Sequence, residues 1–259
     1  PNRRMPEINL KAGITAAGKY LPPKRLTNKD LEKIVETSDE WIKSRTGIEE
    51  RRISESGQAS SHLCLEAYKN LQKTANIDSS EINAIIVGTV TPDMLFPSTA
   101  CLIQNEIGAE NAWGFDLSAA CSGFLFALET ATRMIESGRY NKILVFGVDT
   151  MSSIVDYEDR NTCILFGDGA GVVLLEPVKD GTGVIDTKMR IDGSGGKYLC
   201  MKAGGSLIPA SHESVDNKFH YVYQDGGSVY KYAVKGMADI SNDVAVRNNL
   251  SPDDIDLFI

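Results

Sequence analysis

The chain has 259 residues, of which 42% are hydrophobic and 24% charged, and this composition is typical of a globular protein rather than a disordered or fibrous one. The net charge is −8. Because such a surface repels a phosphate backbone, we expect no nucleic acid partner.

The five cysteines indicate a reducing compartment. Their number is odd and none of them forms a C-x-x-C pair, which argues against a zinc site and against a secreted disulfide framework. No apolar segment typical of a signal peptide follows the first residues, and stretches such as Ala84–Val87 and Ile143–Phe146 are too short to span a bilayer. We therefore expect a cytoplasmic protein with no membrane partner.

Helical and strand patterns alternate along the chain. In chain order, they predict a helix over 60–75, a strand over 84–90, a helix over 98–107, a strand over 112–118, a helix over 121–137 and strands over 142–148 and 172–175. Pro97 marks the start of the second helix, and Gly138 marks the end of the third. This order predicts an α/β fold with a mostly parallel sheet covered by helices.

Residues 76–86 (NIDSSEINAII) and 249–259 (NLSPDDIDLFI) resemble each other. Each follows a helical segment, about 228–248 in the second case, and each ends in a predicted strand. We interpret the pair as a duplication, although two unrelated helix-turn-strand units can look alike. The duplication predicts an N-terminal half over 1–178 and the start of a C-terminal half over 179–259. Because the second copy stops on its strand, we expect that half to be incomplete.

Cys121 is the strongest candidate for chemistry. It lies in Asp116-Leu-Ser-Ala-Ala-Cys-Ser-Gly-Phe124, where a strand ends, small residues make a tight turn and a helix begins. A helix N-terminus presents unpaired N–H groups and a partial positive charge, and both favour the thiolate that a nucleophilic cysteine needs. The alternative is a small cysteine buried in the core, which is a common fate of free cysteines.

Two other features suggest no chemistry. Gly167-Asp-Gly-Ala-Gly171 could be mistaken for a phosphate loop, but a strand pattern follows it, so it lacks the donors of a helix N-terminus. We expect close backbone packing there. The three histidines, His62, His212 and His220, are expected to be structural or on the surface.

The segment around Cys121 resembles the active-site motif of β-ketoacyl-acyl carrier protein synthase III, a thiolase-like condensing enzyme family. Other segments agree in the same order: Thr37-Ser-Asp-Glu-Trp41, Arg45-Thr-Gly-Ile48, Arg51-Arg52, Phe96-Pro-Ser-Thr99, Asp159-Arg160 and Phe166-Gly-Asp-Gly-Ala-Gly171. The resemblance runs from about Ile14 to Ile259. It implies a thiolase fold, in which two duplicated α/β halves stack in five layers, and a homodimer with strand 112–118 near the interface.

The resemblance also implies an activity. Cys121 would take an acetyl or other short acyl group from coenzyme A, and the acyl-enzyme would then condense with malonyl-acyl carrier protein and release carbon dioxide. This would be the initiating condensation of type II fatty-acid synthesis. Acyl-CoA and malonyl-acyl carrier protein would be the partners, with no cofactor beyond the coenzyme A thioester that serves as substrate.

The family roles imply that Trp41 and Arg160 hold the adenine of coenzyme A between them, with Thr37 and Arg45 nearby. Indole and guanidinium faces both stack on a flat base, so the assignment is physically reasonable. From the residues alone, the alternatives are a core tryptophan and a surface ion-pair arginine.

Three further positions are implied by the resemblance. Phe96 would reach across the dimer interface and line the acyl pocket of the partner, whereas the alternative is a buried core phenylalanine. Gly226-Gly-Ser-Val-Tyr230 resembles the family's G-N-E-V-F segment beside the pantetheine tunnel. Because Gly227 replaces the asparagine and Tyr230 the phenylalanine, the tunnel role is less well supported.

The family's P-H-Q-A-N and N-x-G-N-T-S segments are not found in this sequence. Their histidine and asparagine stabilise the enolate that forms on decarboxylation. We therefore expect this chain to be deficient in condensation. The alternatives are a related acyltransferase of secondary metabolism and a non-catalytic acyl-CoA-binding or dimerisation fragment.

Overall fold

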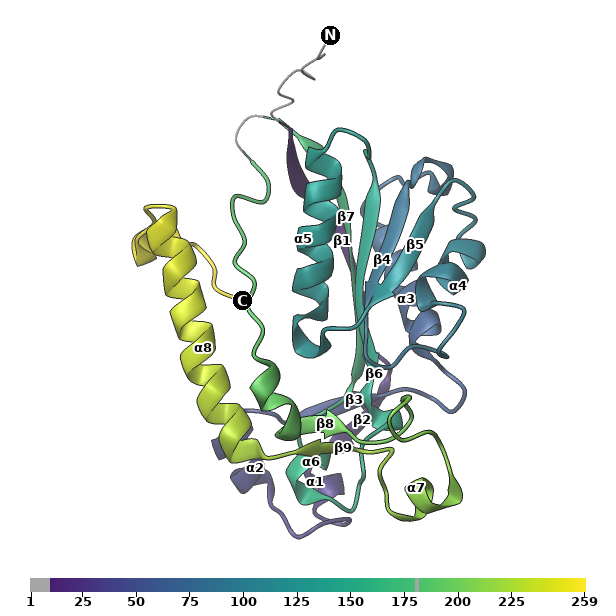
Figure 1. The fold of residues 1–259 in the computed structure, drawn as a ribbon, viewed down its shortest axis with the longest axis vertical. Helices are drawn as coiled ribbons and strands as arrows, with labels where there is room; N and C mark the ends of the chain where they lie inside the picture. The colour runs from purple at the N-terminus through teal and green to yellow at the C-terminus, as the bar shows by residue number, and fades with distance from the viewer. Residues whose placement is uncertain (1–9, 180–181) are drawn as a thin grey trace.

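A five-stranded mixed sheet forms the centre of the molecule (Figure 1). The computed structural model describes residues 10–179 and 182–259. In the order β1-β7-β6-β4-β5, the strands are β1 (Lys11–Tyr20), β7 (Asp168–Val178), β6 (Ile143–Thr150), β4 (Ala84–Gly88) and β5 (Trp113–Leu117). β4 is parallel to β5 and β6, whereas β7 is antiparallel to β6 and β1. β5 therefore forms one edge of the sheet.

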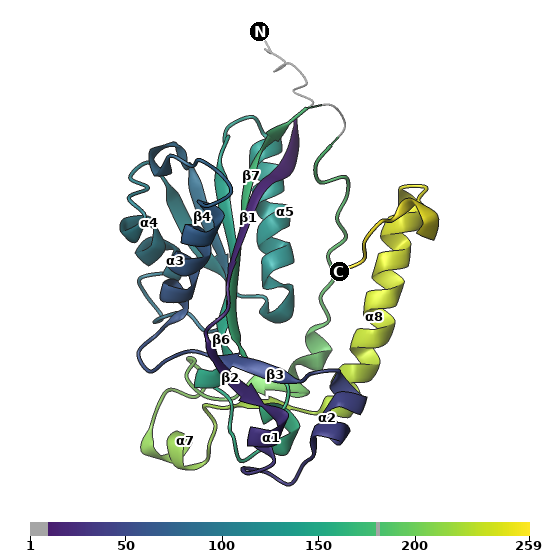
Figure 2. The ribbon, with the colours of Figure 1, turned by 180° about the vertical axis from the view of Figure 1, so that it is seen from behind.

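Helices cover both faces of this sheet, as Figures 1 and 2 show from opposite sides. The covering helices are α5 (Gly123–Glu136) on one face and α3 (Ser60–Leu71) and α4 (Thr99–Glu106) on the other. In α5, Ala127, Ala131 and Ile135 recur every four residues and are fully buried against the strands. The two alanines allow α5 to lie close to the sheet, and this contact fixes the helix that follows Cys121.

Besides the apolar clusters that pack on the sheet, another lies beside one end of it. It is built from two short sheets, β2 (Lys24–Thr27) with β3 (Glu50–Ile53) and β8 (Leu199–Met201) with β9 (Val222–Gln224), and from the helices α1 (Asn28–Leu31), α2 (Asp39–Thr46) and α6 (Arg160–Cys163). Leu31, Ile42, Cys163 and Val222 are buried in it. We call it the small lobe. It joins β8 and β9 to α2, although these segments are far apart in the sequence.

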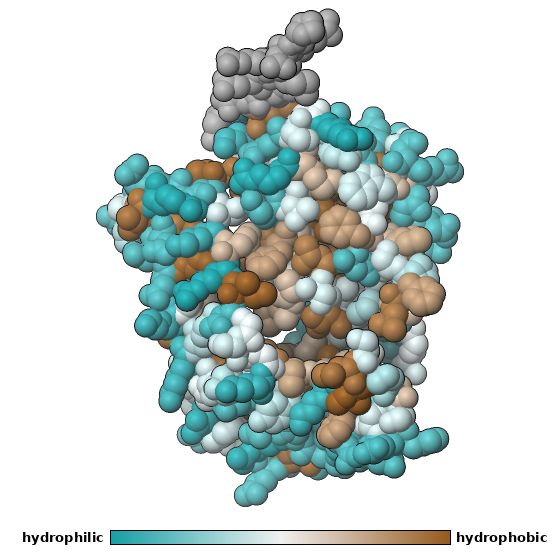
Figure 3. Space-filling view, in the orientation of Figure 1, coloured by the Kyte–Doolittle hydropathy of each residue, from teal (hydrophilic) through white to brown (hydrophobic). Residues whose placement is uncertain are grey.

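The long helix α8 (Gly226–Arg247) stands away from the sheet on the side of α5 (Figures 1 and 2). None of its residues is buried. Near its C-terminal end, Arg247 and Asn248 hydrogen-bond Asp186, and Lys188 pairs with Asp243. Figure 3, in the orientation of Figure 1, shows apolar surface on the face of the molecule that carries α5 and α8. Among the described helices, none combines the length and the apolar character that crossing a membrane requires.

The sequence located most elements of the first half. Helices predicted over 60–75, 98–107 and 121–137 are α3, α4 and α5, the strands over 84–90, 112–118 and 142–148 are β4, β5 and β6, and the run 172–175 lies inside β7. The expectation of a mostly parallel sheet was wrong, because two of its four pairings are antiparallel. The segment between β6 and β7 stays in the small lobe at one end of the sheet, so the chain returns antiparallel rather than crossing over.

The two similar segments share a helix and a turn. α3 is followed by the 3₁₀ turn Ser79–Glu81, and α8 is followed by the 3₁₀ turn Pro252–Asp254. The strand predicted at 256–259 is wrong for this structure, because those residues are exposed and pair with no described strand. A strand needs a neighbour for its backbone groups, and β4 has one on each side. The division at residues 178 and 179 stays a prediction.

Candidate active site

Cys121 lies on a sharp turn between β5 and α5. After β5 ends at Leu117, a 3₁₀ turn covers Ala120–Ser122, and α5 begins at Gly123. Ala120 has φ of 46°, in the left-handed region that residues other than glycine rarely adopt. Cys121 itself is exposed, so the reading of a buried core cysteine is wrong. A strained turn that exposes a side chain at the start of a helix is the geometry of a nucleophile elbow.

Glycines allow the helix to approach the sheet at this point. A Cβ atom at Gly88, the last residue of β4, would lie 2.6 Å from the carbonyl carbon of Gly123 and 2.8 Å from the backbone nitrogen of Phe124. A Cβ atom at Gly147 in β6 would lie 3.1 Å from the Cβ of Phe124. The first turn of α5 therefore rests directly on two strands, and this contact fixes the elbow.

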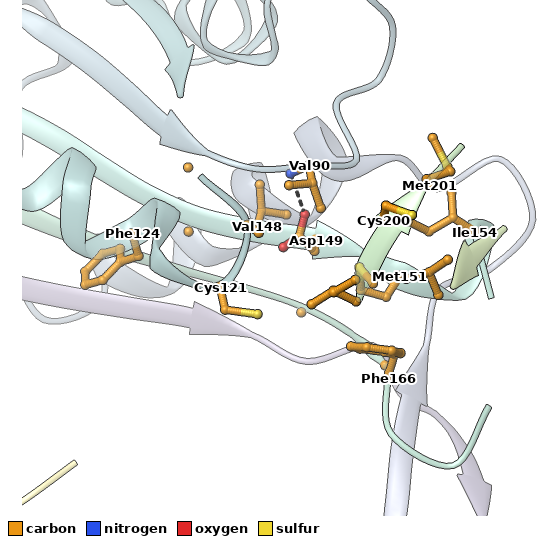
Figure 4. A pocket seen from close by; sticks show the side chains of 17 residues that line it. Val90, Cys121, Phe124, Val148, Asp149, Met151, Ile154, Phe166, Cys200 and Met201 are labelled. Carbon is orange, nitrogen blue, oxygen red and sulfur yellow. Dashed lines mark hydrogen bonds between the residues drawn. The ribbon is translucent and has the colours of Figure 1, made fainter. Parts of the chain in front are cut away.

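The Cys121 side chain faces a cavity of about 610 Å³ (Figure 4). Figure 4 shows Cys121 on one side of the cavity, with Met151 and Phe166 opposite and Cys200 and Met201 beyond them. Most of the lining is apolar or sulfur-containing, and Asp149 is the one carboxylate among the lining residues. Such a lining suits an acyl chain.

The two exposed cysteines, Cys121 and Cys101, lie at helix N-termini that differ in capping. At the N-terminus of α4, which carries Cys101, the Asp116 carboxylate accepts hydrogen bonds from Thr99 N at 2.7 Å and Ala100 N at 2.9 Å. A carboxylate there offsets the partial positive charge of α4. The N-cap of α5, Ser122, makes no side-chain capping bond.

Two of the remaining cysteines are buried. Desolvation raises the pKa of the Cys64 thiol well above its usual range, and it also raises the pKa of Cys163. Neither thiol is therefore suited to nucleophilic chemistry near neutral pH.

Trp41 lies close to two arginines in the small lobe. The guanidinium carbon of Arg45 is 4.9 Å from the centre of the indole ring, and that of Arg160 is 5.1 Å from it. Arg160 also donates a hydrogen bond of 3.0 Å to the carbonyl oxygen of Glu36. Thr37, one residue further on, has a buried hydroxyl oxygen with no hydrogen-bond partner in the structure. The four residues expected at the coenzyme A site are thus neighbours.

The small lobe connects this cluster to the cavity. Phe166, Leu199 and Val222 line the Cys121 cavity, and the same side chains belong to the apolar cluster against which Trp41 packs. Of these, Phe166 belongs to the segment Phe166–Gly171 that resembles the family. Leu199 and Val222 were missed, because the three-residue strands β8 and β9 are too short to give a periodic signal.

The other predicted positions lie outside the cavity. Phe96 has 82% of its surface exposed and Leu95 has 86%, so the reading of a buried core phenylalanine is wrong. Gly227 and Tyr230 lie in the exposed first turns of α8 and do not line the Cys121 cavity. Their family roles stay predictions.

The three histidines, all within the described ranges, also lie outside the cavity. His62 accepts a hydrogen bond from Ala59 N in the first turn of α3, and His220 shares one of 2.8 Å with Ser214. His212 begins the short helix α7 (His212–Asp216) and is exposed. This agrees with the structural or surface roles expected from the sequence.

Known proteins resemble this chain over nearly its whole length. A family model of 3-oxoacyl-[acyl-carrier-protein (ACP)] synthase III matches residues 115–193. The β-ketoacyl-[acyl-carrier-protein] synthase III of Koribacter versatilis (strain Ellin345) is 55% identical over 251 residues, which are 96% of this chain and 75% of the relative.

Solved structures agree. The 3-oxoacyl-[acyl-carrier-protein] synthase III of Aquifex aeolicus VF5 is 39% identical, with a TM-score of 0.84, and the match covers 96% of this chain and 75% of that one. The priming β-ketosynthase from the R1128 polyketide biosynthetic pathway is 32% identical, with a TM-score of 0.80, over 93% of this chain and 70% of that one.

These likenesses confirm the thiolase-like α/β fold that the motifs implied. The matched region of the family model includes the elbow and Cys121. The chain belongs to the β-ketoacyl-[acyl-carrier-protein] synthase III family, the acyltransferases that carry out the initiating condensation of fatty-acid synthesis.

Proposed function

We propose that Cys121 accepts an acetyl or other short acyl group from coenzyme A, and that the acyl-enzyme is the intermediate for condensation with malonyl-acyl carrier protein. The observation that carries this proposal is the position of Cys121, exposed on a strained elbow at the start of α5 and facing an apolar cavity of about 610 Å³.

In the first step, the Cys121 thiolate attacks the carbonyl carbon of the coenzyme A thioester. The carbonyl electrons move to oxygen, return as the carbon–sulfur bond to coenzyme A breaks, and leave the acyl group on Cys121 and the thiolate on coenzyme A. The uncapped N-terminus of α5 favours negative charge beside Cys121 before the attack. The apolar lining of the cavity offers the transferred acyl chain a surface to pack against.

Coenzyme A would be held in the small lobe. Trp41 offers an indole face, and Arg45 and Arg160 offer guanidinium groups that can stack on adenine or bind phosphate. The family motif also places Thr37 at this site, although its hydroxyl is buried in this structure. These assignments follow the family motif residue by residue.

The second step requires groups that stabilise an enolate. Malonyl-acyl carrier protein would lose carbon dioxide, and the resulting enolate carbon would attack the acyl-Cys121 carbonyl and release the thiolate. Loss of one electrostatic donor typically lowers a rate by about 10²–10³. None of the three histidines faces the Cys121 cavity. We propose that the 259-residue polypeptide forms the acyl-enzyme, slowly at most, and yields no β-ketoacyl product.

Two alternatives remain as outcomes of the test. An acyltransferase of secondary metabolism is favoured by the likeness to a priming β-ketosynthase of a polyketide pathway. A non-catalytic acyl-CoA-binding or dimerisation fragment would bind acyl-CoA without forming a covalent bond. Incubation with acetyl-CoA and with longer acyl-CoA thioesters, followed by peptide mass mapping, separates these functions. A preference for acetyl supports fatty-acid synthesis, a preference for a longer or branched group supports the second function, and no acylation at all supports the third.

A further inference from the structure

Asp149 joins the ends of the two strands that lie beside Cys121. Its Oδ1 atom accepts hydrogen bonds from Thr89 Oγ1 at 3.1 Å, from Val90 N at 2.8 Å and from Thr91 Oγ1 at 3.0 Å. Asp149 lies near the end of β6, and its three donors directly follow β4. Figure 4 shows the bond to Val90 at the wall of the cavity. We call these four residues the Asp149 clamp.

Further hydrogen bonds hold the clamp in place. Thr91 Oγ1 accepts from Thr150 N at 2.8 Å, and Thr91 N donates to Thr89 Oγ1 at 3.1 Å. Ser60 Oγ, at the start of α3, donates to the carbonyl oxygen of Thr91 at 2.6 Å. Thr89 and Thr91 are buried, so water competes poorly for these bonds.

The clamp determines where Val90 lies. Val90 lines the Cys121 cavity and also a second cavity of about 490 Å³ on the other side of the elbow. Leu117, Phe126 and Ile191 are among the residues that line this second cavity. Among the described residues, Val90 and Ala120 alone line both cavities, and Ala120 is part of the elbow itself. Val90 therefore separates the two spaces, and its backbone nitrogen is fixed by Asp149.

We propose that Asp149 is a positioning residue that, through Val90, limits how far an acyl chain on Cys121 extends from the first cavity into the second. The clamp thus sets the acyl chain length that the enzyme accepts. This inference rests on the proposed acyl transfer to Cys121. Differences of a methylene or more in an apolar pocket change relative rates by about 10–200-fold, so a small shift of Val90 has a measurable effect.

The test uses substitutions that alter the clamp without enlarging the first cavity. Thr91→Val keeps the shape of the side chain and removes its hydroxyl, and Thr91 does not line the Cys121 cavity. Asp149→Asn removes the charge from the acceptor, and Thr91→Ser keeps the hydroxyl. The matched control is Asn83→Ala. Asn83 Oδ1 accepts from Asn141 N at 2.8 Å and Lys142 N at 3.1 Å, where it links β4 to β6 at the opposite end of the sheet.

The readout is the ratio of Cys121 acylation rates from acetyl-CoA and hexanoyl-CoA. We expect Thr91→Val and Asp149→Asn each to lower this ratio by about fivefold or more, because the partition between the cavities loosens. Thr91→Ser and Asn83→Ala should keep the ratio of the unchanged protein, even if Asn83→Ala lowers the stability. Combining Thr91→Val with Asp149→Asn should change the ratio little further, because both substitutions loosen the same set of hydrogen bonds around Val90.

A second readout needs no acyl transfer. The ratio of Cys121 alkylation rates by iodoacetamide and by N-hexyl iodoacetamide should shift in the same variants. If the unchanged protein is not acylated but the alkylation ratio shifts, the proposed function fails and the role of Asp149 stands. An unchanged ratio in both clamp variants, or an equal change in Asn83→Ala, overturns the proposal. If one clamp variant does not fold, the other decides the question.

Discussion

The chemical difference between the five cysteines depends on what surrounds each thiol. Cys121 faces a cavity at an uncapped helix N-terminus, whereas Cys101 lies on a helix whose N-terminus is satisfied by Asp116. Burial raises the pKa of Cys64 and Cys163, and a raised pKa leaves less thiolate at neutral pH.

Limited iodoacetamide labelling at neutral pH is therefore expected to modify Cys121 first. Cys64 and Cys163 should react only after unfolding, with Cys101 and Cys200 intermediate. Peptide mass mapping at low conversion measures the order. Labelling of Cys101 or Cys200 ahead of Cys121 in a folded sample would mean that the helix N-terminus does not activate the thiol.

The indole of Trp41 is expected to contribute to coenzyme A binding. Loss of stacking on a base costs about 1–3 kcal/mol by alanine substitution. Trp41→Ala and Arg160→Ala should therefore raise the KM for acetyl-CoA by roughly tenfold, with a smaller effect on the acylation rate at saturation.

The control for this prediction is Arg139→Ala. Arg139 also lies over an aromatic ring, that of Tyr140, at 5.9 Å, but it does not line the Cys121 cavity. An equal rise of KM in Arg139→Ala, or no rise in Trp41→Ala, would argue against adenine stacking at Trp41.

The contact between β4 and α5 is the element-scale feature on which the elbow depends. Gly88→Ala would place a Cβ within 3 Å of the backbone of Gly123 and Phe124, so the helix must shift. We expect a loss of about 1–3 kcal/mol in the free energy of unfolding and slower alkylation of Cys121. Urea unfolding and iodoacetamide kinetics measure the two effects.

Gly193→Ala is the matched control, because a Cβ at Gly193 would meet nothing within 4 Å. It should leave both measurements unchanged. If Gly88→Ala lowers stability but leaves the alkylation rate unchanged, the elbow does not depend on this contact.

Periodicity predicted the elements that pack on the sheet, and it failed where tertiary contacts decide the structure. The helix after Cys121 was predicted from a face of Phe124, Leu125, Leu128 and Ile135. The structure buries Ile135, but it leaves Leu125 exposed and buries the alanines of α5 instead. β8 and β9 have three residues each and owe their position to the small lobe. The role of Asp149 was also not predictable, because its three donors lie about 60 residues earlier in the chain.

The residues of the site also differ in how far the sequence alone identified them. The turn around Cys121 left both a nucleophile and a buried core cysteine open until the family motif favoured the nucleophile. Trp41, Arg45 and Arg160 were identified from the family motifs alone. Their mutual proximity follows from the packing of α2 against α6 in the small lobe, and no local pattern of the sequence encodes it.

At the scale of the whole molecule, the edge of the sheet suggests self-association. β5 is an edge strand, and Trp113 on it is 49% exposed. Leu95 and Phe96, in the segment that precedes α4, are also exposed. Unpaired edges and exposed apolar patches favour association. We propose a homodimer formed through this edge.

Light scattering at micromolar concentration should therefore give twice the monomer mass. Phe96→Asp should shift the equilibrium toward the monomer, because it places a charge in the apolar contact. Leu207→Asp is the control, since Leu207 is equally exposed but lies in the loop after β8. A monomeric unchanged protein, or equal dissociation by Leu207→Asp, would refute the proposed dimer interface.

The most direct test of the central claim is the mass of the protein after incubation with acetyl-CoA. The account predicts a gain of one acetyl group per chain, mapped to the peptide that contains Cys121 and removed by hydroxylamine. Cys121→Ala should show no gain, while Cys101→Ala should be acetylated as the unchanged protein is. Acetylation of Cys121→Ala to the same extent, or no acetylation of the unchanged protein while acetyl-CoA remains bound, would contradict the assignment of Cys121 as the acyl-accepting nucleophile.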